Sequence, residues 1–214
     1  FSDDGRPVIL LQPGRSTLAR TPVSAAKDDV TRVKTTLRIA ADGSASGEDV
    51  RTGTGGSMLG FADWADSFAS EDPVTVARHL LLQNNLTGEG TYSVQRLDTG
   101  KDFAFTLQYE LPNFAGYGAL RVVPPLDPFE ASARQEVSDK SVRRLPFSCG
   151  SRTTTHDIEL VFPPGASFEV PRGESVSGSG RRYTSTYRRD GASLRIRREY
   201  VSEQPKNSCP PSHQ

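Results

Sequence analysis

Residues 181–201, RRYTSTYRRDGASLRIRREYV, contain two runs of alternating residues on either side of an Asp-Gly pair. Asp-Gly between β-rich runs is a strong signal for a tight hairpin, because both central residues of such a turn need a positive φ angle. With Asp190 and Gly191 as the loop, position i faces position 381 − i, so Tyr187 is expected opposite Leu194. The segment therefore predicts an antiparallel hairpin, and with it a β-rich fold.

The two faces of this predicted hairpin differ in chemistry. One face is largely apolar and carries Tyr183 and Tyr187. The other face is a row of polar side chains, which we interpret as the solvated side of a half-buried antiparallel sheet. Its arginines are the candidate interaction surface of the chain: Arg182, Arg188, Arg195 and Arg197.

The net charge of the whole chain argues against a nucleic-acid partner. The 26 Lys and Arg are balanced by 26 Asp and Glu, whereas nucleic-acid binding normally depends on a dominant basic surface. Tyr183 and Tyr187 face away from the arginines, so they cannot form a stacking platform beside them. No apolar stretch is long enough to span a bilayer, and we therefore predict neither a nucleic-acid partner nor a membrane span.

The fold class that we predict is mainly β, an antiparallel sheet module with an inserted helix pair, followed by an Ig-like antiparallel β-sandwich. The 19 Gly and 15 Pro suit short strands and many turns. The predicted units are a strand or linker from an upstream domain (1–23), the β module with its two helices (24–123), a connector rich in proline (124–143) and the sandwich (144–214).

Two helices are expected between β-rich stretches. Helical spacing of Met58, Phe61, Ala62, Ala65 and Phe68 predicts the first, with Ser57 as its N-cap. The second is expected to begin with Asp72 as cap and Pro73 in the first turn, and to end at Asn84 or Asn85. Its buried face is predicted to consist of Val76, Ala77, Leu80 and Leu81.

Strands are expected on both sides of the helices. Val33, Thr35, Leu37 and Ile39 alternate on one face of a strand that turns at Asp42-Gly43. Further strands are predicted in TYSVQRLDT, DFAFTLQYEL (the two joined by a turn at 99–101), GALRVV, TTTHDIELVFP, ASFEVP and ESVSG.

The two cysteines, Cys149 and Cys209, each lie between turn residues at the edge of a β-rich region. A polar setting is unusual for a buried free thiol, so we predict a disulfide that ties the C-terminal tail to the start of its own domain. The alternative makes Cys149 a nucleophile with His156 as its base, but no third residue that would orient the imidazole is identifiable.

For the other candidate sites, a structural role explains the residues better than a functional one. TGTGGSMLG resembles a phosphate-binding turn, but Met58 occupies the place of the third glycine, so a strand-to-helix joint is favoured. His79, His156 and His213 have no metal-ligand spacing. The acidic residues Asp63, Asp66, Glu71 and Asp72 are interpreted as solvated helix positions. We therefore expect no catalytic residue, no metal and no cofactor.

The second half of the chain carries a resemblance to a known family. Pro146-Phe147, Asp157-Ile158-Glu159, Pro163 to Gly165, and Tyr187 to Gly191 with Leu194, Ile196 and Arg198 are its motifs. Together with LARTPVSAAKDDVTRVKTTLRIAADGSASGE they resemble the β-rich C-terminal region, a domain of unknown function, that follows a transglutaminase-like core in exported bacterial proteins. The likeness covers most of residues 5–210.

The resemblance implies a periplasmic, cell-surface or secreted protein. The catalytic Cys, His and Asp of the transglutaminase-like core are then expected upstream of Phe1, so the chain itself is expected not to be an enzyme. The leading hypothesis is a non-catalytic accessory region that packs against the upstream transglutaminase-like domain or positions its substrate. This hypothesis predicts a bare apolar patch near residues 7–18.

Two alternatives stay open. The first is an independent Ig-like module that binds a cell-envelope protein or polysaccharide, which predicts a concave aromatic groove. The second is an autonomous hydrolase, which predicts a deep pocket with convergent titratable groups.

Overall fold

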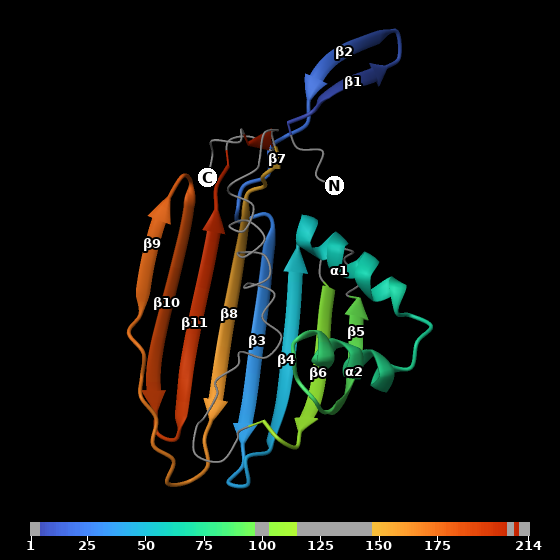
Figure 1. The fold of residues 1–214 in the computed structure, drawn as a ribbon. Coiled ribbons are helices and arrows are strands. Elements are labelled where there is room, and N and C mark those ends of the chain that lie inside the picture. Colours follow the sequence, from blue (N-terminus) through green and yellow to red (C-terminus); the bar gives the residue numbers. More distant parts are fainter. Residues whose placement is uncertain (1–4, 97–102, 115–146, 205–207, 210–214) are drawn as a thin grey trace.

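The computed structural model describes residues 5–96, 103–114, 147–204 and 208–209, and its main feature is one sheet of eight strands (Figure 1). The strand order across this sheet is β5-β6-β4-β3-β8-β11-β10-β9. The bounds are β3 (Val30–Ile39), β4 (Ala45–Thr54), β5 (Glu89–Arg96), β6 (Phe103–Leu111), β8 (Arg152–Val161), β9 (Glu174–Gly178), β10 (Arg181–Asp190) and β11 (Ser193–Ser202). The prediction of a mainly β fold with an inserted helix pair is confirmed.

The pairing of β3 with β8 joins the two halves of the chain. It runs parallel from Val30 opposite Thr153 to Arg38 opposite Val161, whereas the other ladders are antiparallel. A backbone hydrogen bond of 2.9 Å from Thr153 N to Asp29 O extends the contact at one end. Strands from residues 24–123 and from residues 144–214 therefore belong to a single sheet.

The expected Ig-like sandwich is not confirmed. A sandwich needs a second sheet that faces the first, but β8, β11, β10 and β9 continue the plane of β3 instead of lying over it. The apolar side of these strands, with Leu160 and Ile196, is continuous with that of β3, so both halves bury one shared face. Residues 166–171, predicted as a strand, have no regular secondary structure, and Phe168 from this segment stacks on Phe162.

The hairpin of β10 and β11 forms as predicted, but the predicted register is wrong by two residues. Asp190 faces Ser193 and Tyr187 faces Ile196, so partners sum to 383 instead of 381. Gly191, with a φ of 59°, is the first residue of the two-residue loop and not the second. That position is where a type II′ turn requires glycine. Because the shift is even, the assignment of side chains to the two faces is unchanged.

One face of the sheet, here called the inner face, holds the core. The inward residues of β3 are Val33, Thr35, Leu37 and Ile39, as the alternation predicts, and all four are buried. β6 contributes a continuous inward row. The apolar residues that the strands bury together are Leu37, Ile39, Ala45, Phe103, Phe105, Leu107, Tyr109, Leu111, Ile158, Leu160, Leu194 and Ile196.

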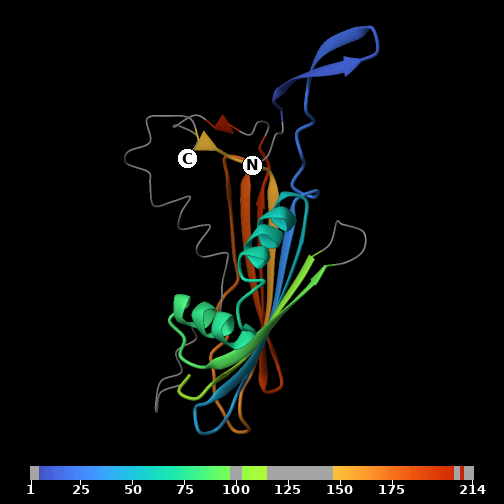
Figure 2. The same ribbon diagram turned by 90° about the vertical axis from the view of Figure 1, so that its right-hand side faces the viewer.

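Both helices, α1 (Gly56–Ser67) and α2 (Pro73–Gln83), cover the inner face over β4, β5 and β6 (Figure 2). α2 confirms its prediction, with Asp72 as N-cap, Pro73 in the first turn and the four expected residues buried. For α1, Ser57 is not the cap. The cap is Gly55, so the helix begins two residues earlier than predicted, and the Ser57 amide donates to Asp29 Oδ1 at 2.7 Å. Trp64 of α1 packs edge-on against Phe105.

Two short ribbons lie outside the main sheet. β1 (Pro7–Gln12) and β2 (Arg15–Arg20) form a two-stranded sheet that projects from one end of the molecule (Figure 1). β7 (Phe147–Ser148) pairs with β12 (Ser208–Cys209), and Cys149 and Cys209 form the predicted disulfide. The predicted connector (124–143), the strand at 118–123, the turn at 99–101 and His213 lie outside the described residues.

The disulfide closes a loop with a sequence separation of 60 residues. Replacing both cysteines by serine should lower the free energy of unfolding by about 4 kcal/mol, because the unfolded chain regains the entropy that the cross-link removes. Urea denaturation of the oxidised protein and the double variant measures this difference. Equal midpoints and slopes for the two proteins would contradict a stabilising role.

Candidate functional site

The arginine-rich candidate surface lies on the face of the sheet opposite the helices, here called the outer face. Cross-strand neighbours form continuous rows over β3, β8, β11 and β10. One row contains Lys34, Asp157, Arg197 and Thr186, and the next contains Thr36, Glu159, Arg195 and Arg188. The structure therefore brings all four predicted arginines to one solvent-facing surface, as the sequence indicates.

Each of these arginines has an acidic neighbour on the same face. Arg182 lies 3.0 Å from Glu199, and Arg197 lies 3.2 Å from Asp157. Arg188 and Arg195 face each other directly, and the Asp190 carboxylate lies 3.9 Å from the first and 3.2 Å from the second. Arg195 also reaches Glu159 at 3.4 Å.

The four arginine side chains are more than half exposed, so each ion pair is worth little to stability. Their collective effect is to neutralise the surface. The arginine rows and their acidic neighbours thus form a charge-balanced ion-pair network and not a basic patch.

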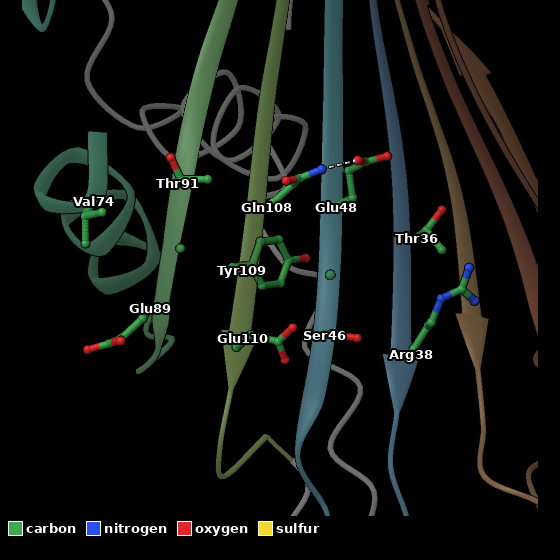
Figure 3. A pocket seen from close by; sticks show the side chains of 12 residues that line it. Thr36, Arg38, Ser46, Glu48, Val74, Glu89, Thr91, Gln108, Tyr109 and Glu110 are labelled. Atoms are coloured by element: carbon green, nitrogen blue, oxygen red, sulfur yellow. Dashed lines mark hydrogen bonds between the residues drawn. The ribbon is translucent and has the colours of Figure 1, made fainter. Parts of the chain in front are cut away.

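A hollow of about 660 Å³ lies over β3, β4, β6 and β5 (Figure 3). Gln108 donates to Glu48 across it at 2.9 Å. The volume is that of a small-molecule site, but such sites are mostly apolar with a few convergent polar groups. Here the described lining is polar or glycine except for Val74 and the buried Tyr109, and it includes no His or Cys: Thr36, Arg38, Ser46, Gly47, Glu48, Val74, Glu89, Gly90, Thr91, Gln108, Tyr109 and Glu110.

Three polar side chains also meet inside the core. Thr35 on β3 donates its hydroxyl proton to Asp49 Oδ1 on β4 and lies 2.9 Å from His156 Nε2 on β8. Because a hydroxyl has a single proton, His156 Nε2 is the donor in the second bond. All three side chains are buried, so this network holds the strands β4, β3 and β8 together and is closed to a substrate.

Tyr109 lies near this network. Burial, together with the nearby Asp49 carboxylate, raises the pKa of Tyr109 above its usual value. Its ring occupies the space over Gly47 on the neighbouring strand, where an added Cβ would lie 2.3 Å from the ring. Tyr109 is therefore a neutral packing residue at this position.

The remaining candidate residues do not form a common site. Cys149 is bonded to Cys209, so the proposed pair of a Cys149 nucleophile with a His156 base is wrong. His79 is exposed and bonds Gln83 at 2.8 Å. Asp63, Asp66 and Glu71 are exposed, and Asp72 caps α2, where hydrogen bonds from Thr75 lower the pKa of its carboxyl. Within the described ranges no three His, Cys, Asp or Glu are placed to hold a metal ion.

A second candidate surface is the ribbon of β1 and β2. Ile9 faces Leu18 across the ribbon, and Leu11 follows two residues later on the same side. These three side chains are 67%, 79% and 83% exposed, respectively. An apolar patch near residues 7–18 is expected from the sequence, and the structure adds that β1 folds on β2 and gathers these side chains on one face.

Comparisons of the chain with protein-family models, with curated proteins and with solved structures find no match. The resemblance to the C-terminal region of transglutaminase-like proteins therefore stays a prediction. In the part of the chain that the structure describes, no helix has the length and apolarity required to cross a bilayer.

The buried network makes a prediction about stability. Thr35→Val removes the hydroxyl between Asp49 and His156, so each of them loses one hydrogen bond in the core. We expect the free energy of unfolding to fall by about 2 kcal/mol. The matched control is Thr36→Val, the same change one residue along on the outer face, for which we expect less than about 0.5 kcal/mol. Equal effects in chemical denaturation would show that the network contributes nothing specific.

The surface ion-pair network of the arginine rows leads to a prediction about polyanion binding. At physiological ionic strength, about 0.15 M, the wild-type protein should pass unretained through a heparin column, because its arginines are neutralised by neighbouring acids. A variant with Asp157→Asn and Glu159→Gln should elute at higher salt. Strong retention of the wild type would mean that the arginines are available to an anionic ligand.

Proposed function

We propose that this chain is a non-catalytic accessory module that docks, through the apolar face of the β1–β2 ribbon, on a transglutaminase-like catalytic domain of the same polypeptide. The observation that carries the proposal is the exposure of Ile9, Leu11 and Leu18 on one face of a ribbon that pairs with no other described strand.

A two-stranded ribbon is marginally stable in water when nothing covers it. Burying the three side chains on another domain would contribute several kcal/mol, since each large aliphatic residue gives roughly 1.5–3 kcal/mol when fully buried. The ribbon therefore gains stability from a partner surface that is itself apolar.

The charge of the ribbon restricts the partner further. Between residues 5 and 21 the chain has three arginines, Arg6, Arg15 and Arg20, and no acidic residue. These arginines favour a partner whose apolar surface is bordered by carboxylates, and they disfavour a partner with a basic surface.

The placement of reactive groups supports a role without catalysis. Both cysteines are bonded to each other, and the described His156 lies in the buried network with Thr35 and Asp49. The disulfide is typical of oxidising compartments, which supports a periplasmic or cell-surface location.

An independent module that binds a cell-envelope protein or polysaccharide is the alternative. A polysaccharide site of this kind depends on exposed aromatic side chains in a groove, and the rows of the outer face contain Thr, Arg, Lys, Asp and Glu. No observation on the described residues favours this alternative over docking.

The test is an affinity measurement between this chain and the catalytic domain encoded upstream in the same reading frame. We expect the double variant with Ile9→Asp and Leu18→Asp to bind at least tenfold more weakly, because two charges would be buried at the contact. Leu82→Asp, which alters a leucine of α2 that is 56% exposed, is the matched control and should bind as the wild type does.

Two results would contradict the proposal. One is a reading frame that encodes no transglutaminase-like segment before Phe1. The other is binding that the ribbon variant and the α2 control weaken equally, since the ribbon would then have no particular part in docking.

A further inference from the structure

Among the described strands, β9 is the last one at one edge of the main sheet (Figure 1). Its partner is β10, and all five of its residues are exposed, including Val176 at 62%. Natural sheets commonly protect an edge with a Lys, a Pro or a bulge, because free backbone groups can pair with another strand. The sequence of β9, ESVSG, contains neither Lys nor Pro, and its single charged residue, Glu174, is at the first position of the strand.

The direction of the backbone groups in β9 follows from one hydrogen bond. The Glu174 amide donates to Ser185 Oγ on β10 at 3.2 Å, so it is directed into the sheet. Backbone groups alternate in direction along a strand that pairs on one side. The N–H and C=O groups of Ser175 and Ser177 are therefore directed to the free edge.

We propose that two copies of this chain pair antiparallel through β9, about a twofold axis at Val176. In this arrangement Ser175 of one copy faces Ser177 of the other, and the outward backbone groups of both residues are exchanged in hydrogen bonds. An isologous contact of this kind uses the same patch on both copies. The proposal does not depend on the proposed docking function.

The side chains of β9 are complementary to themselves in this register. The two exposed Val176 side chains meet on the inner side of the joined sheet. Glu174 faces Gly178 of the second copy, so no like charges are opposed. Beyond that glycine, on the same face, lies Arg181 of the second copy, since Arg181 pairs with Gly178 within each chain. Glu174 can therefore reach a cation across the small residue.

Sedimentation velocity on the full chain tests the association. We expect the mean mass to rise from monomer to dimer between about 5 and 500 µM, as for a small and reversible interface. Ser177→Pro removes one outward N–H and leaves the bonds to β10 intact, and Val176→Lys opposes two charges at the axis. Each should weaken association at least tenfold, whereas Val170→Lys, which alters an exposed valine outside β9, should not.

Cysteine cross-linking tests the register. The Val176 pair is of the non-hydrogen-bonded type, in which Cα atoms lie about 4.5 Å apart, within the range for a disulfide. Val176→Cys should cross-link into dimers under a mild oxidant such as copper phenanthroline. Ser175→Cys should not, because Ser175 faces Ser177 of the other copy.

A monomer at about 500 µM overturns the proposal, and so does a dimer that Ser177→Pro and Val176→Lys leave unchanged. Equal cross-linking of the two cysteine variants has the same consequence. The variant with Ile9→Asp and Leu18→Asp should leave the dimer intact. Its loss in that variant would show that the ribbon, and not β9, joins the copies.

Discussion

The parallel ladder between β3 and β8 is the contact on which the rest of the structure depends. On one side of it lie β4, β6 and β5, and on the other lie β11, β10 and β9. With β3 counted in the first group and β8 in the second, each group of four strands has a single apolar face, and only their union places Leu37 beside Leu160 in one continuous core. Its partners are more than 110 residues apart, so a long loop must close before the ladder can form, and contacts of this kind favour slower folding than the local contacts of a helical protein.

Local features of this fold could be predicted because they depend on neighbouring residues. The alternation in residues 181–201 determines which side chains face the core, and the Asp72-Pro73 pair determines where α2 begins. The register of the hairpin was missed because a shift of two residues leaves the alternation unchanged. The choice between the two registers depends on which central position of the turn Gly191 occupies.

The order of strands could not be predicted. A parallel pair has no turn between its members, so nothing in the sequence around Val33 or His156 indicates that β3 and β8 are neighbours. When the strand order is unknown, the sequence pattern of the C-terminal strands also fits a separate β-sandwich. The unknown strand order also concealed two of the acidic partners of the arginines, because Asp157 and Glu159 lie on β8 and reach β11 only across the sheet.

The buried network was also missed, although it left a signal. Thr35 and Asp49 occupy inward positions in alternating strands, where a polar residue needs an internal partner. That partner, His156, is more than 100 residues away in the sequence. A polar residue at an inward position therefore indicates that a partner exists, but its identity depends on the order of strands.

The position of the disulfide has a mechanical consequence. Cys149 lies just before β8 and Cys209 lies beyond the end of β11. Since β8 and β11 are antiparallel neighbours, the disulfide links them at the same end of the sheet. Tension applied to the chain beyond Cys209 passes through sulfur to the start of β8 and not into the last residues of β11. The hydrogen bonds between β11 and its neighbours are thereby shielded from peeling that starts at the C-terminal end of the strand.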